Sequence, residues 1–215
     1  NLPICFFSLE TSKKMLSYRL LSMETGIESG RLKTGRLTQE EWPILGEAIY
    51  FLSENPIYLI DKPSIQVSEI YQFCEEVKNK HKKDLGVIII DFLQLMEDKS
   101  LGKNISREDE ISKIMNDLKI LSINLEVPII ITSQLKRELE TRTNKRPMLS
   151  DIRESEVIEN RADLIAFIYR DEYYNPETDE RGITEIIVTK QRNGPVGTVK
   201  LLFEPQYTRF RNLAI

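Results

Sequence analysis

Short apolar runs and longer segments of helical periodicity alternate along the first part of the chain. Apolar, β-branched runs that end in polar residues predict strands, and apolar positions three and four residues apart predict helices. Strands are predicted at 4–8, 57–60, 87–90 and 129–132. Helices are predicted at 12–26, 38–53, 67–81 and 106–125. Alternating strands and helices with right-handed crossovers predict a mostly parallel sheet flanked by helices.

Two polar segments predict where helices begin. In Thr38-Gln-Glu-Glu41 the Thr38 hydroxyl can accept the Glu41 amide while the Glu41 carboxylate reaches back, which is a capping box. Ser106-Arg-Glu-Asp109 offers a second helix start. The apolar stripe that follows it comprises Ile111, Ile114, Met115, Leu118, Leu121 and Leu125.

The pattern changes in the last part of the chain, where strands follow one another. They are predicted at 164–169, 183–189 and 198–203, with Asn193-Gly194-Pro195 turning the last two. The fold class is therefore α/β, with an antiparallel C-terminal extension. The chain of 215 residues has room for one such domain, and no shift in composition requires two.

The net charge is weakly acidic, at −4, with a pI near 5.3. This balance argues against a protein that coats nucleic acid by bulk electrostatics, so any nucleic-acid contact has to be local. Between Gln134 and Arg153, six basic residues stand against three acidic ones, and this is the only basic cluster with a loop-like sequence. A solvated surface loop is the alternative interpretation of that segment.

The composition indicates the cellular compartment and excludes some kinds of site. No apolar run approaches the roughly 18 residues of a membrane span, and no basic segment precedes the first apolar residues. We therefore expect a soluble protein without a targeting signal. Cys5 and Cys74 give neither a disulfide framework nor a metal spacing, which favours a reducing compartment. The single histidine, His81, argues against a His-based metal or acid–base site.

Polar residues with useful chemistry follow three of the predicted strands. They are Glu10, Asp91 and Gln134. In open α/β sheets ligands bind at the carboxyl edge, so these side chains converge if their strands are neighbours. Phosphoryl transfer to water needs such a set: one acid to orient the water, one acid to hold Mg²⁺, and an amide to sense the γ-phosphate. Taken singly, each residue is more simply interpreted as a solvated turn residue, whereas three at successive strand ends favour the phosphoryl-transfer site.

A pair of cations ends the strand predicted at 183–189. Alternation along a strand places Lys190 and Arg192 on one face, ahead of the tight turn. An arginine there could clamp a neighbouring subunit's nucleotide, a contact worth roughly 10³–10⁵ in rate. A basic hairpin tip is the alternative, and spacing alone does not separate the two.

Seven segments carry a family likeness. They are Phe7-Ser-Leu-Glu10, Ile89-Ile-Asp91-Phe-Leu-Gln-Leu-Met96, Ile131-Thr-Ser-Gln134-Leu-Lys-Arg137, Lys145-Arg-Pro-Met-Leu-Ser-Asp-Ile-Arg-Glu-Ser155, Ala162-Asp163-Leu-Ile, Tyr169-Arg-Asp171-Glu and Lys190-Gln-Arg-Asn-Gly-Pro195. In this order, over essentially the whole chain, they resemble the helicase core of the DnaB-type replicative helicases. The last segment and the one ending in Arg-Glu-Ser are specific to that family rather than to RecA-like ATPases in general.

The resemblance implies a role for each matching residue at the nucleotide. Glu10 matches the catalytic glutamate, Asp91 the Walker B aspartate that holds Mg²⁺, and Gln134 the glutamine that couples nucleotide state to DNA. Lys190 and Arg192 match the pair inserted in trans into the adjacent subunit's site. Arg19 matches a position against the base.

The resemblance also implies partners and a place. Arg153 and Glu154 fall in the loop that tracks the backbone of single-stranded DNA, and Glu156 stands where that loop usually has Gly. ATP and Mg²⁺ are the implied cofactors, and single-stranded DNA, a homo-hexameric ring, a primase and a helicase loader are the implied partners, with no membrane. The bacterial cytoplasm or the plastid stroma is the implied location.

Two departures limit what carries over. The phosphate-binding motif G-x-x-x-x-G-K-[ST] is missing, so the predicted RecA-like domain, 1–215, is expected to be incomplete at its N-terminus and to bind ATP poorly by itself. At Glu156 a carboxylate replaces a small residue, which hinders approach to phosphate and adds repulsion. Arg161, where an acid is more usual, offsets part of that repulsion.

Two interpretations of the chain remain. One is the ATPase motor of a hexameric helicase, and the other is a RecA-like module without a P-loop that acts only in binding or assembly. The joint presence of Glu10, Asp91, Gln134, Lys190 and Arg192 favours the motor, because a module that does not hydrolyse ATP has no need for all five.

Overall fold

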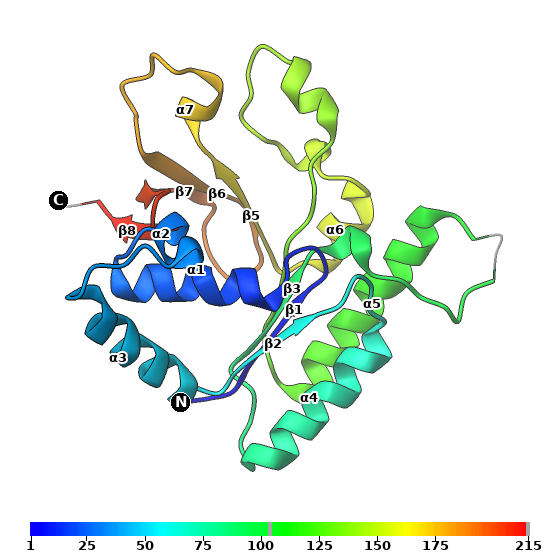
Figure 1. Cartoon of the computed structure of the whole chain (residues 1–215). Helices are drawn as coiled ribbons and strands as arrows, with labels where there is room; N and C mark the ends of the chain where they lie inside the picture. The colour runs from blue at the N-terminus through cyan, green and yellow to red at the C-terminus, as the bar shows by residue number, and fades with distance from the viewer. Residues whose placement is uncertain (103–104, 214–215) are drawn as a thin grey trace. The chain divides into compact units, whose positions relative to one another are not determined.

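The computed structural model describes residues 1–102 and 105–213, which form two compact units (Figure 1). The first unit comprises Asn1–Tyr18 and Thr38–Gln134, and the second comprises Arg19–Leu37 and the described chain from Leu135 onward. The first unit holds a parallel sheet and the second an antiparallel one, which confirms the predicted fold class. A single domain over 1–215, incomplete at its N-terminus, stays a prediction.

The sheet of the first unit has four parallel strands in the order β2-β1-β3-β4. They are β1 (Ile4–Ser8), β2 (Ile57–Asp61), β3 (Val87–Asp91) and β4 (Ile129–Ile131). Ser8 lies opposite both Asp61 and Asp91, so three strands end level with one another. Phe7, Ile88 and Ile90 are fully buried and alternate with half-buried residues along β1 and β3, so the core lies against one face of the sheet.

The helices of this unit are α3 (Glu41–Glu54), α4 (Val67–His81) and α5 (Arg107–Leu125), with a 3₁₀ turn η1 (Leu93–Leu95) after β3. In Figure 1, α4 and α5 lie side by side against one face of the sheet. All six members of the apolar stripe predicted on α5 are buried. The helix α1 (Lys13–Thr25) begins in the first unit and ends in the second.

The two predicted helix starts differ in outcome. Ser106 caps α5, since its hydroxyl accepts the Asp109 amide at 3.1 Å. The capping box at Thr38 forms only in part: the Glu41 carboxylate accepts the Thr38 amide at 2.8 Å, but the Glu41 amide bonds the Thr38 carbonyl at 3.2 Å instead of its hydroxyl. Residues 38–40 therefore form a turn, and α3 begins at Glu41.

The sheet of the second unit is antiparallel, in the order β5-β6-β7-β8. Its strands are β5 (Leu164–Tyr169), β6 (Ile183–Gln191), β7 (Gly197–Glu204) and β8 (Arg209–Asn212). The helices are α2 (Ser29–Thr34), α6 (Ser155–Arg161) and α7 (Asp171–Tyr174), with 3₁₀ turns η2 (Arg137–Thr141) and η3 (Leu149–Asp151). The sequence pattern missed β8, α2, α6 and α7, since each is too short to show a period.

No helix in the described ranges is both long and apolar enough to cross a membrane.

Candidate functional site

The three polar residues predicted at strand ends lie at one edge of the parallel sheet. Glu10, Asp91 and Gln134 follow β1, β3 and β4, which are neighbours. Beyond the strands themselves the pairing continues, since the Leu9 amide donates to the Asp91 carbonyl at 2.7 Å and the Thr132 amide to the Ile90 carbonyl at 3.0 Å. The predicted arrangement of the three residues is therefore confirmed, while their roles stay a prediction.

A hydroxyl beside Asp91 orients its carboxylate. The Thr132 side chain donates to Asp91 Oδ1 at 2.6 Å, and Asp91 is half-buried. In the part of the chain that the structure describes, no group of three or more His, Cys, Asp or Glu residues could hold a metal ion. A single oriented carboxylate fits Mg²⁺, because this ion keeps several waters and needs only one or two protein oxygens beside phosphate. Thr132 went unnoticed in the sequence, where a strand-end hydroxyl is unremarkable.

Gln94 holds the segment that carries Gln134. The Gln134 amide donates to Gln94 Oε1 at 3.2 Å, and Gln94 Nε2 donates to the Ser133 hydroxyl at 2.9 Å. Gln94 lies in η1, three residues after Asp91. The segments after β3 and β4 are thus tied together by side chains. Sequence reasoning included Gln94 in a family segment without giving it a role.

The loop that carries Glu10 is fixed at both ends. The buried Ser8 hydroxyl donates to the Thr11 carbonyl at 2.6 Å, and the Lys13 amide at the start of α1 donates to Asp61 Oδ2 at 2.9 Å. That amide holds the pKa of Asp61 below its ordinary value. Asp61 is thus a further carboxylate at this edge, but its contact is with α1. Glu10 itself is exposed.

In the second unit, Lys190 and Arg192 contact the end of α6. Lys190 Nζ donates to the carbonyl of Glu159 and, at 2.8 Å, to that of Ala162. Arg192 Nη2 donates to the Asn160 carbonyl at 2.8 Å. The two cations therefore lie on the same side of their strand end, as the alternation predicts.

The predicted DNA loop leads into α6 from the other end. Glu154 adopts the left-handed conformation with φ 52° as the N-cap of α6, and its carbonyl accepts the Ile158 amide at 3.3 Å. Arg153 is half-buried and Glu156 is exposed in the first helical turn. Within the described residues the Arg153 side chain makes no hydrogen bond or ion pair.

Most of the basic cluster before Arg153 holds its own loop together. Arg142 forks onto Asp151 at 3.1 and 3.0 Å, so Asp151 does not serve as the partner of Arg153. Lys136 Nζ donates to the Ser150 carbonyl at 2.8 Å, and Lys145 donates to the Glu140 carbonyl. These three cations therefore have partners within the loop.

Arg146 anchors the same loop to the antiparallel sheet. Its Nη2 lies 2.5 Å from Oε1 of Glu185 on β6, and the Glu185 side chain is only 3% exposed. Its guanidinium also lies 5.2 Å from the centre of the Tyr169 ring. A buried carboxylate is costly without a cation, so this pair fixes the loop to β6.

We expect Arg146→Ala to lower the free energy of unfolding by about 1–3 kcal/mol, because it leaves the buried Glu185 carboxylate with only the more distant Lys200, 4.0 Å away. Urea unfolding measures this change. Arg137→Ala is the matched control, since the Arg137 side chain has no hydrogen bond or ion pair among the described residues. Glu185→Gln should recover part of the loss in the Arg146→Ala background. Equal losses for the two arginine variants would refute the anchor.

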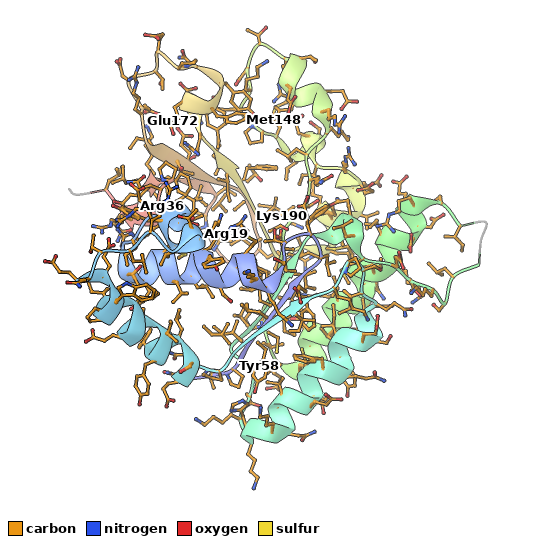
Figure 2. All side chains as sticks on the ribbon, in the orientation of Figure 1. Arg19, Arg36, Tyr58, Met148, Glu172 and Lys190 are labelled. Atoms are coloured by element: carbon orange, nitrogen blue, oxygen red, sulfur yellow. The ribbon has the colours of Figure 1, made fainter. Side chains whose placement is uncertain are left out.

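Arg19 lies on α1 and is exposed, and Figure 2 labels it together with Lys190 of β6. No hydrogen bond or ion pair of the Arg19 side chain occurs in the described ranges. Its predicted contact with a base stays a prediction.

Comparisons with known proteins cover nearly the whole chain. The family described as "DnaB-like helicase C terminal domain" matches residues 1–212. "Replicative DNA helicase DnaB" of Geobacillus stearothermophilus is 48% identical over 213 residues, which are 99% of this chain and 46% of that protein. "Replicative DNA helicase DnaC" of Bacillus subtilis (strain 168) is 47% identical over 210 residues, 98% of this chain and 46% of that protein. The chain spans about half the length of these relatives.

Solved structures agree with the sequence comparison. The chain resembles a solved ATPase domain with a TM-score of 0.92 and 40% identity, covering 99% of this chain and 75% of that one. It also resembles a DnaB-like replicative helicase whose structure was solved together with its interactions with primase. The TM-score is again 0.92 at 40% identity, covering 99% of this chain and 51% of that one.

Proposed function

Because the chain belongs to the DnaB-like helicase C-terminal domain family, we propose that it is the motor of a hexameric replicative DNA helicase. ATP hydrolysis would drive translocation on single-stranded DNA and thereby unwind the duplex. The observation that carries this proposal is the position of Glu10, Asp91 and Gln134 after three neighbouring parallel strands. The relatives' names support the same helicase function.

In this proposal each residue at the sheet edge has one task. Glu10 orients the attacking water and accepts its proton. Asp91, with its carboxylate oriented by Thr132, holds Mg²⁺. The metal supplies charge neutralisation at the transferring phosphate. Gln134, tied to Gln94, senses the γ-phosphate and passes its presence to the second unit's DNA loop.

The cations of the second unit act on other groups. Lys190 and Arg192 stabilise charge on the nucleotide of the adjacent subunit, and Arg19 lies against the base. Arg153 and the amide of Glu154 contact the DNA backbone, since a helicase has to pass any sequence and so needs phosphate contacts rather than base readout.

One similar structure is named for the interactions of a DnaB-like helicase with primase, so we include a primase among the partners of this chain. A helicase loader is added from the family likeness. The bacterial relatives support a cytoplasmic location for the proposed motor, and the relative from Trieres chinensis keeps the plastid stroma as the alternative.

The test uses the full-length protein, with ATP hydrolysis measured with and without single-stranded DNA and unwinding measured on a forked duplex. We expect hydrolysis stimulated by DNA and unwinding that requires ATP. Assembly and DNA binding without hydrolysis would instead support the binding module. Asp91→Asn separates ATP-driven unwinding from a contaminating activity, because it removes the proposed Mg²⁺ ligand.

We expect Arg153→Ala to weaken binding of single-stranded DNA almost equally for all sequences and to flatten the dependence of affinity on salt, because a phosphate contact carries no base information. Affinity against salt concentration measures both effects. Arg137→Ala, which removes an exposed cation of the preceding basic segment, is the control. A loss of thermal stability with an unchanged salt slope would show that Arg153 only braces the loop.

Glu156→Gly should act in the opposite sense to Arg153→Ala. It removes a carboxylate near the phosphates and lets the backbone approach them, so binding should tighten. The same salt titration reports it, and weaker binding would contradict the proposed position of Glu156 beside DNA.

A further inference from the structure

The carbonyls at the C-terminal end of α6 bind two cations at the end of β6. Three of them accept hydrogen bonds from side chains: Glu159 and Ala162 from Lys190, and Asn160 from Arg192. The final carbonyls of a helix have no partner within the helix and carry a partial negative charge. The ammonium and guanidinium groups therefore supply hydrogen-bond donors to carbonyls that the helix itself leaves unpaired.

Asp163 makes two contacts with Arg192 and, in the part of the chain that the structure describes, none with Lys190. Its carbonyl accepts the Arg192 amide at 2.9 Å, and its Oδ1 lies 3.2 Å from Arg192 Nη1. Backbone and side chain of the arginine are thus fixed by one residue. Lys190 has no comparable contact with a carboxylate in the described chain.

This ion pair contributes little to stability. The side chains of Arg192 and Asp163 are 47% and 52% exposed, and ion pairs in water at that exposure add little net free energy. The contact leaves donors free, because a guanidinium has five N–H groups and the contacts with Asp163 and Asn160 engage Nη1 and Nη2 once each. Its effect is to restrict the direction of a long side chain while leaving N–H groups for another anion.

We propose that Asp163 is a positioning residue that orients Arg192 toward the nucleotide of the adjacent subunit. The inference rests on the proposed function, in which Arg192 acts in trans. Without the Asp163 carboxylate, the Arg192 amide still donates to the Asp163 carbonyl, and Nη2 still donates to the Asn160 carbonyl. The guanidinium loses the contact at Nη1 that sets its plane. Transition-state stabilisation depends on such preorganisation, so the loss falls on kcat rather than on KM for ATP.

The test compares Asp163→Asn with Asp84→Asn in the full-length protein. Asp84 is a matched control, because it also forms an exposed ion pair, with Lys78 at 3.2 Å. We expect Asp163→Asn to lower kcat for DNA-stimulated ATP hydrolysis roughly tenfold, less than the ~10³ of removing the arginine. KM for ATP and Tm should match those of Asp84→Asn. An unchanged kcat would overturn the proposal.

Rings assembled from two variants show on which side of the shared nucleotide site the Asp163→Asn defect lies. Asp163→Asn subunits mixed with Glu10→Gln subunits should gain activity, since each supplies what the other lacks to a shared site. Mixed with Arg192→Ala subunits they should gain none, because both defects lie on the same side of that site. Gain with Arg192→Ala, or none with Glu10→Gln, would refute the role of Asp163.

A mixture of Arg192→Ala and Glu10→Gln subunits tests the proposed function separately from the positioning role of Asp163. If Arg192→Ala and Glu10→Gln subunits fail to complement each other at any ratio although each assembles, action in trans is wrong. If they complement and Asp163→Asn behaves like Asp84→Asn, only the positioning role is wrong.

Discussion

Replacing Glu10 with Gln should lower the rate of ATP hydrolysis by roughly 10²–10⁴-fold in the full-length protein, the range contributed by a positioned general base. The glutamine keeps the size of the side chain but accepts no proton. Glu10 is exposed at the sheet edge, so its removal opens no cavity and should leave assembly and Tm unchanged.

Steady-state ATP hydrolysis, nucleotide binding and ring assembly should be measured together for Glu10→Gln. Glu76→Gln on α4 is the control, since Glu76 is an exposed glutamate within the same unit. ATP binding should persist while hydrolysis is lost. A Glu10→Gln protein that retains more than about a tenth of the activity would exclude Glu10 as a general base.

Replacing Arg192 with Ala should lower ATP hydrolysis by at least about 10³-fold, because an arginine supplied in trans stabilises charge in the transition state. Activity should return when these subunits are mixed with Glu10→Gln subunits, as expected of a site shared between two chains. Arg181→Ala is the control, since Arg181 is also exposed and also donates to a backbone carbonyl, that of Pro176 at 3.1 Å. A loss for Arg192→Ala equal to that for Arg181→Ala would contradict the role in trans.

The sequence allowed most of the first unit to be predicted, because its elements have clear periods. The helix 67–81 and the strand 4–8 have the predicted bounds, and β3 exceeds its prediction by one residue. The apolar, β-branched run of β3 indicates burial in a parallel sheet, and Ile88 and Ile90 are fully buried. Once β1, β3 and β4 are parallel neighbours, the convergence of the residues that follow them is a geometric consequence.

The second unit was less predictable for a physical reason. The segment between Gln134 and Leu164 has no long apolar period, since side-chain contacts with backbone carbonyls and ion pairs hold it instead. Such contacts join residues far apart in the chain, for example Lys190 and Glu159. No rule based on residue spacing predicts them. β8 escaped prediction because Arg209-Phe-Arg-Asn212 has no apolar run.

The acceptors of Lys190 are main-chain oxygens, and every amino acid supplies one. The side chains at positions 159 and 162 can therefore change without moving the ammonium group. A change in length cannot be absorbed in this way: one residue inserted into α6 turns its final carbonyls by about 100° around the helix axis. Related proteins should consequently vary in composition between Ser155 and Ala162 while keeping the number of residues constant.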